Sequence, residues 1–486
     1  MQINFTRQHE GQGALVLATL DSTFPESYKP IKSRALIEKH LSNYDKLPII
    51  STLTAPLDDS YHHIILLNIK NGENLNCTKL EELGAKLYLQ LVKMKVKALT
   101  LDLRDCLGED EHQKTAHLLA GLRLRSFTFH KYKTKEPVPP TLQTIFVITD
   151  QPKESKAAYL PLEAQTKGVF TTRELVSEPP NRLYPKTAAE AAQKLTKFGL
   201  EVEVLDEKAL EQLGMHALLG VGQGSRKPPR LVIVKWQNSP HDEAPLAFVG
   251  KGVTFDTGGI SLKPSGGMDE MKSDMAGAGV VFGLMKTLAL RKAPVNVIGI
   301  MGFAENMPDG NAQRPADIVH SMSGQTIEVL NTDAEGRLLL ADALWYTATR
   351  YAPKLMVDIA TLTGAIVIAL GSLYAGLFSN NDSLASELLA AGVKTGEKLW
   401  RLPLDHEYNK RLDSDIADVK NISAGREAGS ITAAQFLERF VKDVPWAHLD
   451  IAATAWSTKN LALSARGATG FGVRLLDNFI KTNYET

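Results

Sequence analysis

The sequence has very little cysteine, since its 486 residues include only Cys77 and Cys106. Two cysteines are too few for the disulfide framework of a secreted domain or for a thiolate zinc site, so we expect a cytoplasmic protein. An excess of charge is also lacking, because 55 Lys and Arg residues balance 55 Asp and Glu residues. This balance removes the usual argument for nucleic-acid or membrane-surface partners, which rests on a basic chain.

Export and membrane signals are also lacking. The first 20 residues contain no basic segment followed by a continuous apolar run and a cleavage site. Residues 359–381 carry no charge and are long enough to cross ~30 Å of hydrocarbon. Threonines and glycines interrupt this stretch, so we interpret it as a strand, a turn, a short helix and a second strand in a buried core. No membrane association is expected.

Hydrophobic patterning predicts an α/β protein with two domains. Strand-like runs alternate with helical patterns, which favours largely parallel sheets covered by helices. In the first part, the expected strands are 14–20, 63–69, 98–103 and 144–148, and the expected helices are 32–41, 79–94 and 111–124. In the second part, the expected strands are 231–236, 246–250, 295–302, 327–330, 355–359 and 448–452, and the long helices are 275–290 and 337–349.

These patterns place the domain boundaries. We expect a smaller N-terminal α/β domain over residues 1–150 and a larger C-terminal α/β domain over residues 186–486, with a central mixed, mostly parallel sheet. Residues 151–185 would form a linker helix and a Pro-rich connection that contains Pro179 and Pro180. In open sheets of this kind, ligands usually bind beyond the carboxyl ends of the strands.

A first polar cluster lies among glycines at an expected strand end. The block 249–259, VGKGVTFDTGG, contains Lys251 and Asp256. Its glycines allow a ligand to approach the backbone closely, but its spacing matches neither the dinucleotide-binding nor the P-loop pattern. Lys263 follows, and Asp274 comes at the start of an Ala/Gly-rich helix. Taken alone, Asp274 is explained by the preference of helix N-termini for acidic residues.

A second polar cluster is the octapeptide 331–338, NTDAEGRL. In extended backbone Asp333 and Glu335 would project from one face of a strand end, with Arg337 opening the next helix. Adjacent carboxylates repel, so a shared proton, an arginine or a divalent cation must compensate. Taken alone, the octapeptide is also explained as a helix-capping cluster or a surface ion network.

Together the clusters offer four carboxylates: Asp256, Asp274, Asp333 and Glu335. Oxygen-rich ligation suits Mg, Mn or Zn, and bridging carboxylates suit a pair of metals. None of the 12 histidines lies in either block. A mononuclear zinc hydrolase of the H-E-x-x-H type is therefore not supported.

These motifs resemble those of the M17 leucyl aminopeptidase family, the cytosol aminopeptidases. The resemblance also involves residues 178–181, 265–279, 358–364 and 448–452, and it extends from Glu178 to the C-terminus. It implies that residues 186–486 are a dinuclear metallopeptidase domain that removes N-terminal residues, preferentially Leu and other apolar residues, from peptides. It also implies two divalent metal ions, Mn²⁺ or Zn²⁺, and a homohexamer.

The resemblance further assigns roles to single positions. The tighter metal would be held by Lys251, Asp256, Asp274 and Glu335, and the more exchangeable metal by Asp256, Asp333 and Glu335. Lys263 and Arg337 match the two catalytic positions: Lys263 would stabilise the oxyanion, and Arg337 would hold a bicarbonate ion acting as general base. The positions that line the pocket for the first side chain are Met271, Thr361, Gly364, Ala452 and Ala455. From the residues alone, a salt bridge also explains Lys251, and ordinary core packing explains the pocket residues.

A different class of function remains open for the first domain. A DNA-binding regulatory role, which some bacterial relatives combine with peptidase activity, would use a basic stretch containing Arg123, Arg125, Lys131, Lys133 and Lys135. A solvated charged face is the other interpretation of such a stretch. Nucleic acid is therefore an alternative partner beside peptide substrates.

Overall fold

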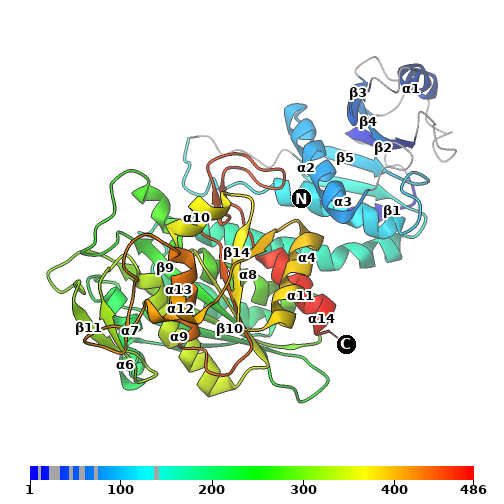
Figure 1. Cartoon of the computed structure of the whole chain (residues 1–486). Coiled ribbons are helices and arrows are strands. Elements are labelled where there is room, and N and C mark those ends of the chain that lie inside the picture. Colours follow the sequence, from blue (N-terminus) through cyan, green and yellow to red (C-terminus); the bar gives the residue numbers. More distant parts are fainter. Residues whose placement is uncertain are drawn as a thin grey trace. The chain divides into compact units, whose positions relative to one another are not determined.

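The computed structural model describes residues 1–8, 13–20, 33–42, 47–53, 61–69, 75–135 and 142–485. The chain forms two compact units, Met1–Glu163 with Leu461–Ala465, and Ala164–Asn460 with Arg466–Thr486 (Figure 1). Most of the expected linker forms one helix, α4 (Pro152–Ser177), which runs from the first unit into the second. The expected start of the first helix at residue 32 lies outside the described residues.

The first unit contains a six-stranded sheet in the order β1-β6-β5-β2-β4-β3. Its neighbouring strands are parallel except for β3, which pairs antiparallel with β4. The strands are β1 (Gln2–Thr6), β2 (Ala14–Leu20), β3 (Ile50–Leu53), β4 (His63–Ile69), β5 (Ala98–Asp102) and β6 (Thr144–Ile148). The helices are α1 (Arg34–Leu41), α2 (Cys77–Lys93) and α3 (Glu111–Arg125). The α/β prediction is confirmed. The sheet also has two edge strands, β1 and β3, that the sequence patterns did not predict.

The second unit contains an eight-stranded sheet in the order β15-β14-β17-β13-β9-β10-β8-β7. Its centre, β17-β13-β9-β10, is parallel, and β8, β14 and β15 run in the opposite direction, so the sheet is mixed, as predicted. The strands are β7 (Glu201–Leu205), β8 (Arg230–Gln237), β9 (Leu246–Asp256), β10 (Asn296–Asn306), β13 (Leu355–Ala360), β14 (Ala375–Ser379), β15 (Leu399–Arg401) and β17 (Trp446–Asp450). The expected strand at 327–330 forms β12 (Thr326–Val329), which pairs with β11 (Asp317–His320) and β16 (Val419–Lys420) in a separate small sheet.

Helices surround the central sheet of the second unit (Figure 1). They are α5 (Pro185–Gln193), α6 (Glu207–Gln212), α7 (His216–Gly222), α8 (Ala276–Arg291), α9 (Glu335–Tyr351), α10 (Gly364–Leu370), α11 (Asp382–Thr395), α12 (His406–Lys410), α13 (Gly429–Glu438) and α14 (Val473–Asn483). A 3₁₀ helix, η4 (Met268–Met275), leads into α8, and another, η3 (Lys194–Phe198), follows α5. A short hairpin of β18 (Trp456–Ser457) and β19 (Gly467–Ala468) completes the described elements.

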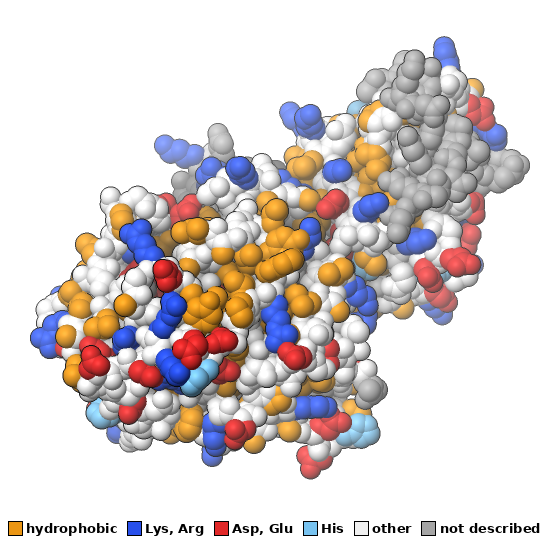
Figure 2. Space-filling model, viewed as in Figure 1, with side chains coloured by type: hydrophobic (Ala, Val, Ile, Leu, Met, Phe, Trp, Pro, Cys, Tyr) orange, Lys and Arg blue, Asp and Glu red, His pale blue; other side chains and the backbone are white. Residues whose placement is uncertain are grey.

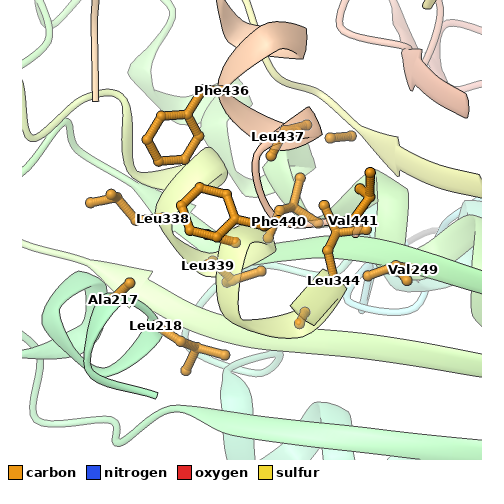
Figure 3. Close-up of a cluster of buried hydrophobic side chains, with 14 of the residues drawn as sticks. Ala217, Leu218, Val249, Leu338, Leu339, Leu344, Phe436, Leu437, Phe440 and Val441 are labelled. Atoms are coloured by element: carbon orange, nitrogen blue, oxygen red, sulfur yellow. The ribbon is translucent and has the colours of Figure 1, made fainter. Parts of the chain in front are cut away.

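Apolar side chains fix α9 in the core of the second unit. Figure 3 shows Leu338, Leu339 and Leu344 of α9 near Phe436 and Phe440, and all five are fully buried. Burying each such side chain stabilises the fold by about 1.5–3 kcal/mol. The first turn of α9 is therefore anchored where the second polar cluster lies.

Two apolar stretches belong to this core. Residues 359–381 form the end of β13, then α10, then β14, which is the predicted strand, turn, short helix and strand. Among the described residues, one helical run, Met268–Arg291, is long and apolar enough to cross a membrane. Because 89% of its apolar window is buried inside the protein, packing in the core explains its composition.

Candidate metal centre and cavity

The polar clusters meet in one cavity of about 660 Å³ in the second unit, beyond the carboxyl ends of β9, β13 and β17. The predicted site residues that line it are Lys251, Asp256, Lys263, Met271, Asp274, Asp333, Glu335, Arg337, Thr361, Gly364 and Ala452. Ala455 is not part of the lining, and it is buried with 4% of its surface exposed. The fold thus brings together residues that are up to 201 positions apart, from Lys251 to Ala452.

Strand β9 is longer than predicted, because it continues past residue 250 to Asp256. Side chains alternate between the faces of a regular strand, so Lys251 and Asp256, five positions apart, would point to opposite faces. The register between β9 and β10 shifts at Thr254, which adds one residue to β9. This β-bulge returns Asp256 to the face that carries Lys251. Both side chains therefore reach the same cavity.

The turn after β9 fixes the carboxylate of Asp256. Gly258 and Gly259 follow with φ values of +87° and +67°, which favour glycine. The Gly258 N–H and the Asn306 Nδ2 each donate to Asp256 Oδ1 at 2.8 Å. The other oxygen, Oδ2, lies 2.7 Å from Lys263 Nζ. One oxygen of Asp256 is thus held by the fold, and the other faces the cavity.

The second cluster begins α9 instead of ending a strand. Asp333 lies in a turn and Glu335 is the first residue of α9, so the predicted extended backbone at these two residues is wrong. A helix N-terminus stabilises a carboxylate, which favours a helical start at Glu335. A Cβ atom on Gly336 would lie 2.6 Å from Cε of Lys251, so glycine allows α9 to start against that lysine.

Lys251 connects the clusters by three contacts of its ammonium group. Its Nζ lies 2.8 Å from Asp274 Oδ1 and 2.9 Å from Glu335 Oε1, and it donates to the Thr361 carbonyl oxygen at 2.8 Å. Burial alone would lower the pKa of Lys251, but the carboxylates of Asp274, Glu335 and Asp256 outweigh burial and raise it above its ordinary value. Without a competing cation, Lys251 is therefore a buried ammonium ion.

The negative charges of the carboxylates in the cavity are only partly balanced by the cationic side chains nearby. Burial raises the pKa of Asp274 to about 6, and burial together with the charge of Asp256 raises the pKa of Glu335 to about 8. Burial and Asp256 also raise the pKa of Asp333. Asp274 Oδ2 and Glu335 Oε2 are buried and form no hydrogen bond within the described residues. Buried polar atoms are normally paired, so these two oxygens indicate an additional cation.

The geometry of the carboxylates fits a metal ion. Ligand oxygens of Asp256, Asp333 and Glu335 all lie within 4.8 Å of one another. Carboxylate oxygens are the ligands that hard divalent cations prefer. Asp274, whose Oδ1 lies 2.8 Å from Lys251 Nζ, adds a further oxygen, Oδ2, that has no partner within the described residues. The donor set therefore suits divalent cations.

The two predicted catalytic residues, Lys263 and Arg337, both line the cavity. Burial opposes the charge of Lys263, but Asp256, Glu335 and Asp333 together raise its pKa, so Lys263 is a cation. Arg337 is buried, and its Nη1 donates to the Asn421 carbonyl oxygen at 2.8 Å. Burial lowers the pKa of Arg337 to about 10, which still leaves it charged at neutral pH. Its Nε has no hydrogen-bond partner within the described residues.

Sequence motifs did not identify two residues that shape the site. Asn306, the last residue of β10, holds Asp256. Asp450, the last residue of β17, accepts hydrogen bonds from Leu362 N and Ala452 N at 3.1 and 3.2 Å and from Thr363 Oγ1 at 2.7 Å. It therefore holds the loop between β13 and α10. Both are polar residues at strand ends beside β9 and β13, and that position is the signal that could have found them.

Comparison with known protein families and relatives agrees with this geometry. The profile of the catalytic domain of the cytosol aminopeptidase family matches residues 170–477. A probable cytosol aminopeptidase of Ehrlichia ruminantium (strain Gardel) is 52% identical over 447 residues, which cover 90% of this chain and 87% of the relative. A probable cytosol aminopeptidase of Rhizobium johnstonii is 45% identical over 499 residues, covering 100% of this chain and 99% of the relative.

A solved structure is similar over nearly the whole chain. The bottromycin maturation enzyme BotP in complex with Mn superposes with a TM-score of 0.83 and 32% sequence identity. The match covers 96% of this chain and 99% of that chain. The similarity therefore includes both units of the fold.

Proposed function

The chain belongs to the cytosol aminopeptidase family and is a metal-dependent aminopeptidase, and we propose that it releases apolar N-terminal residues, preferentially Leu, from peptides with two divalent metal ions. The observation that carries the two-metal proposal is the pair of buried, unpartnered oxygens on Asp274 and Glu335. They lie beside the close group of Asp256, Asp333 and Glu335 oxygens. The Mn in the similar solved structure supports Mn²⁺, with Zn²⁺ as the alternative ion.

We assign the ligands by their place in the cavity. Lys251, Asp256, Asp274 and Glu335 would hold one ion, and Asp256, Asp333 and Glu335 would hold the other. Lys251 could ligate only as a neutral amine, and nearby dications would favour that form. When bound, two such ions activate a shared water and polarise the scissile carbonyl group.

Two cationic side chains of the cavity, Lys263 and Arg337, would stabilise the oxyanion and hold the general base. Lys263 is held between Asp256 and Asp333, where a positive charge would stabilise the oxyanion of a tetrahedral intermediate. Arg337 keeps its charge, and its Nε has no partner among the residues that the structure describes, so its planar group can hold a planar anion such as bicarbonate. Arg337 would hold this ion, which would supply a general base to a cavity whose described lining residues include no histidine.

The cavity wall supports a preference for apolar side chains. Met271, Thr361, Gly364 and Ala452 lie in its lining, together with apolar residues of α10 such as Val367. Ala455 would support this wall from behind. Discrimination by one methylene group in an apolar pocket is about 1–3 kcal/mol, so we expect several apolar residues to be accepted.

A matrix of substrates and metals tests this specificity. Aminoacyl anilides of Leu, Met, Phe, Ala, Lys and Asp would be assayed with Mn²⁺, Zn²⁺, Mg²⁺ and Co²⁺ added to metal-free protein. The proposal expects the highest kcat/KM for Leu or Met and the lowest for Asp, with Mn²⁺ or Zn²⁺ giving the highest activity. A clear preference for Lys or Asp would contradict the apolar assignment.

We also propose a cytoplasmic homohexamer. The relatives are named cytosol aminopeptidases, and large apolar side chains of the second unit, such as Ile368 and Leu373, are 91% and 72% exposed. Figure 2 shows hydrophobic side chains gathered on one face of this unit. Light scattering after gel filtration should give six times the 53.2 kDa mass of one chain, and a monomeric mass would contradict the proposal.

Nucleic-acid binding gains no support from the placement of the basic stretch. Arg125 is buried, and Arg123 donates to the Met1 carbonyl oxygen at 2.7 Å. These arginines pack within the first unit, whereas Lys131, Lys133 and Lys135 are exposed. Three lysines on a short segment give little counterion release, so we do not propose DNA binding.

A further inference from the structure

One stretch of the cavity wall is not used by the proposed chemistry. It is the segment 421–429 between β16 and α13, whose lining residues are Ile422, Ser423, Gly425, Arg426 and Gly429. The proposed metal ligands and the proposed pocket for the first side chain come from other segments. A bound peptide continues past its first residue, so this segment is available to the part of the peptide that follows the cleaved bond.

Hydrogen bonds and close packing hold both ends of this segment against the site. Asn421 is fully buried, and its Nδ2 donates to the Asn331 carbonyl oxygen at 2.7 Å. The carbonyl oxygen of Asn421 accepts from Arg337 Nη1 at 2.8 Å. At the other end, a Cβ atom on Gly429 would lie 3.1 Å from Cβ of Ala365 in α10. The segment therefore has a fixed position beside the second polar cluster and beside α10.

Arg426 differs from the other cationic residues in the described lining of the cavity. The two lysines contact carboxylates, and the other arginine is buried. Arg426 is exposed, and its side chain forms no hydrogen bond or ion pair with the residues that the structure describes. The adjacent acid does not neutralise it, because Glu427 Oε2 lies 3.4 Å from Arg411 Nη1. A residue that lines the cavity thus carries a guanidinium group that the described part of the chain does not pair.

The size of the cavity and the chemistry of a guanidinium group define the ligand. The volume of about 660 Å³ lies within the roughly 300–1,000 Å³ that is typical of small-ligand sites. In a peptide of two or three residues, the terminal carboxylate follows the first residue by roughly 4–7 Å of extended chain. A guanidinium group binds a carboxylate through two parallel hydrogen bonds. A carboxylate close behind the cleaved bond is therefore the group that Arg426 suits.

We propose that Arg426 determines substrate specificity by binding a carboxylate on the part of the peptide that follows the cleaved bond. This role rests on the proposed peptidase function and adds a preference for acidic leaving portions to it. The carboxylate is either the terminal group of a short peptide or an Asp or Glu side chain at the second position. Both sources offer the same chemistry to the guanidinium group, and the substrates of the test distinguish them.

Pairs of substrates that differ in one carboxylate test this role on the full, metal-loaded chain. Leu-Gly is compared with Leu-glycinamide for the terminal group, and Leu-Asp-amide is compared with Leu-Asn-amide for the side chain. In each pair, the ratio of kcat/KM for the acid to kcat/KM for its uncharged partner isolates the contribution of the carboxylate. Arg426→Met should lower one of these ratios by about five- to tenfold, because a charge-assisted pair is lost. Arg314→Met is the matched control, because Arg314 is exposed and does not line the cavity, and it should keep both ratios.

Salt gives a second measurement of the same contact. An exposed ion pair is screened by salt, so the ratio that depends on Arg426 should fall between about 0.05 and about 0.5 M NaCl. This fall should be steeper in the wild-type chain than in Arg426→Met. Equal salt dependence in the two chains would contradict an ion pair with Arg426.

The substrate pairs also identify the source of the carboxylate. A lower Leu-Gly ratio in Arg426→Met assigns the residue to the chain terminus of short peptides, and a lower Leu-Asp-amide ratio assigns it to an acidic side chain. Two unchanged ratios in Arg426→Met, or an equal fall in Arg314→Met, would overturn the role of Arg426 and leave the peptidase function intact. Failure of the wild-type chain to cleave the uncharged partners would instead contradict the peptidase function, and this role with it.

Discussion

Buried charged side chains lie at both ends of helix α8. Those at the carboxyl end are hydrogen-bonded to one another, whereas a carboxylate at the amino end has an oxygen without a partner among the described residues. At the carboxyl end, Arg291 donates to Asp477 Oδ1 at 2.6 Å and to Glu485 Oε2 at 2.7 Å, and Gln165 donates to Asp477 Oδ2 at 2.8 Å. At the amino end, Asp274 Oδ2 has no partner within the described residues. Glu335 Oε2, in the same cavity, also lacks one.

This difference separates a structural charge cluster from a ligand site. Buried ions are tolerated when hydrogen bonds satisfy them, as at Arg291. Buried oxygens that lack a partner and face a cavity imply a group that arrives from solution. The contrast predicts that substitutions at the amino end reduce activity and that substitutions at the carboxyl end reduce stability.

The largest expected effect is on turnover, in Glu335→Gln. Removing the negative charge of this proposed metal ligand should lower kcat by about a thousandfold or more, which corresponds to about 4 kcal/mol of activation free energy. The unfolding midpoint should not fall, because repulsion from Asp256 is relieved. Assays with a leucine anilide, together with thermal unfolding, check both statements. A loss of kcat below tenfold would contradict the assignment of Glu335 as a metal ligand.

The reciprocal change is Arg291→Met at the carboxyl end. It leaves Asp477 and Glu485 buried without their cation, so the free energy of unfolding should fall by about 3–5 kcal/mol. Turnover of the folded protein should stay near the wild-type value. Arg314→Met is the control, because Arg314 forms an exposed pair with Asp317 that contributes at most about 1 kcal/mol. Denaturant titration distinguishes the two variants, and equal stabilities would be the contrary result.

Lys263→Met tests the role of a lysine that follows β9 and lines the cavity. Loss of one oxyanion donor lowers kcat by about 10²–10³, or roughly 3 kcal/mol. KM should change little, because the interaction forms in the transition state. Steady-state kinetics measure both constants. A rise in KM with unchanged kcat would reassign Lys263 to substrate binding.

The smallest expected effect is on specificity, in Met271→Ala. A shortened wall should reduce the preference for Leu over Ala by about tenfold, within the 1–3 kcal/mol that apolar pockets discriminate. The ratio of kcat/KM values for the two anilides measures this preference. An unchanged ratio would remove Met271 from the pocket for the first side chain.

Local patterns in the sequence predicted most of the elements and the residues of the cavity. Strand β13 and helix α8 follow apolar periodicity, which depends on neighbours along the chain. The bulge at Thr254 was not predictable, because it arises from the pairing of β9 with β10. The helical start at Glu335 was not predicted. Two acidic residues two positions apart fit both one face of a strand and the first turn of a helix, and the short segment does not distinguish them. Asn306 on β10 donates a hydrogen bond to Asp256 on the neighbouring strand β9, and a contact between two strands leaves no periodic pattern in the sequence.

Metal binding to the wild-type and Glu335→Gln proteins shows whether the carboxylates of the cavity hold two divalent ions. Chains freed of metal by a chelator would be titrated with Mn²⁺ in a calorimeter, and their aminopeptidase activity would be followed in parallel. We expect two bound ions per wild-type chain, activity only in the loaded form, and loss of tight binding in the variant. Full activity of metal-free wild-type protein, or equal binding by the variant, would contradict it.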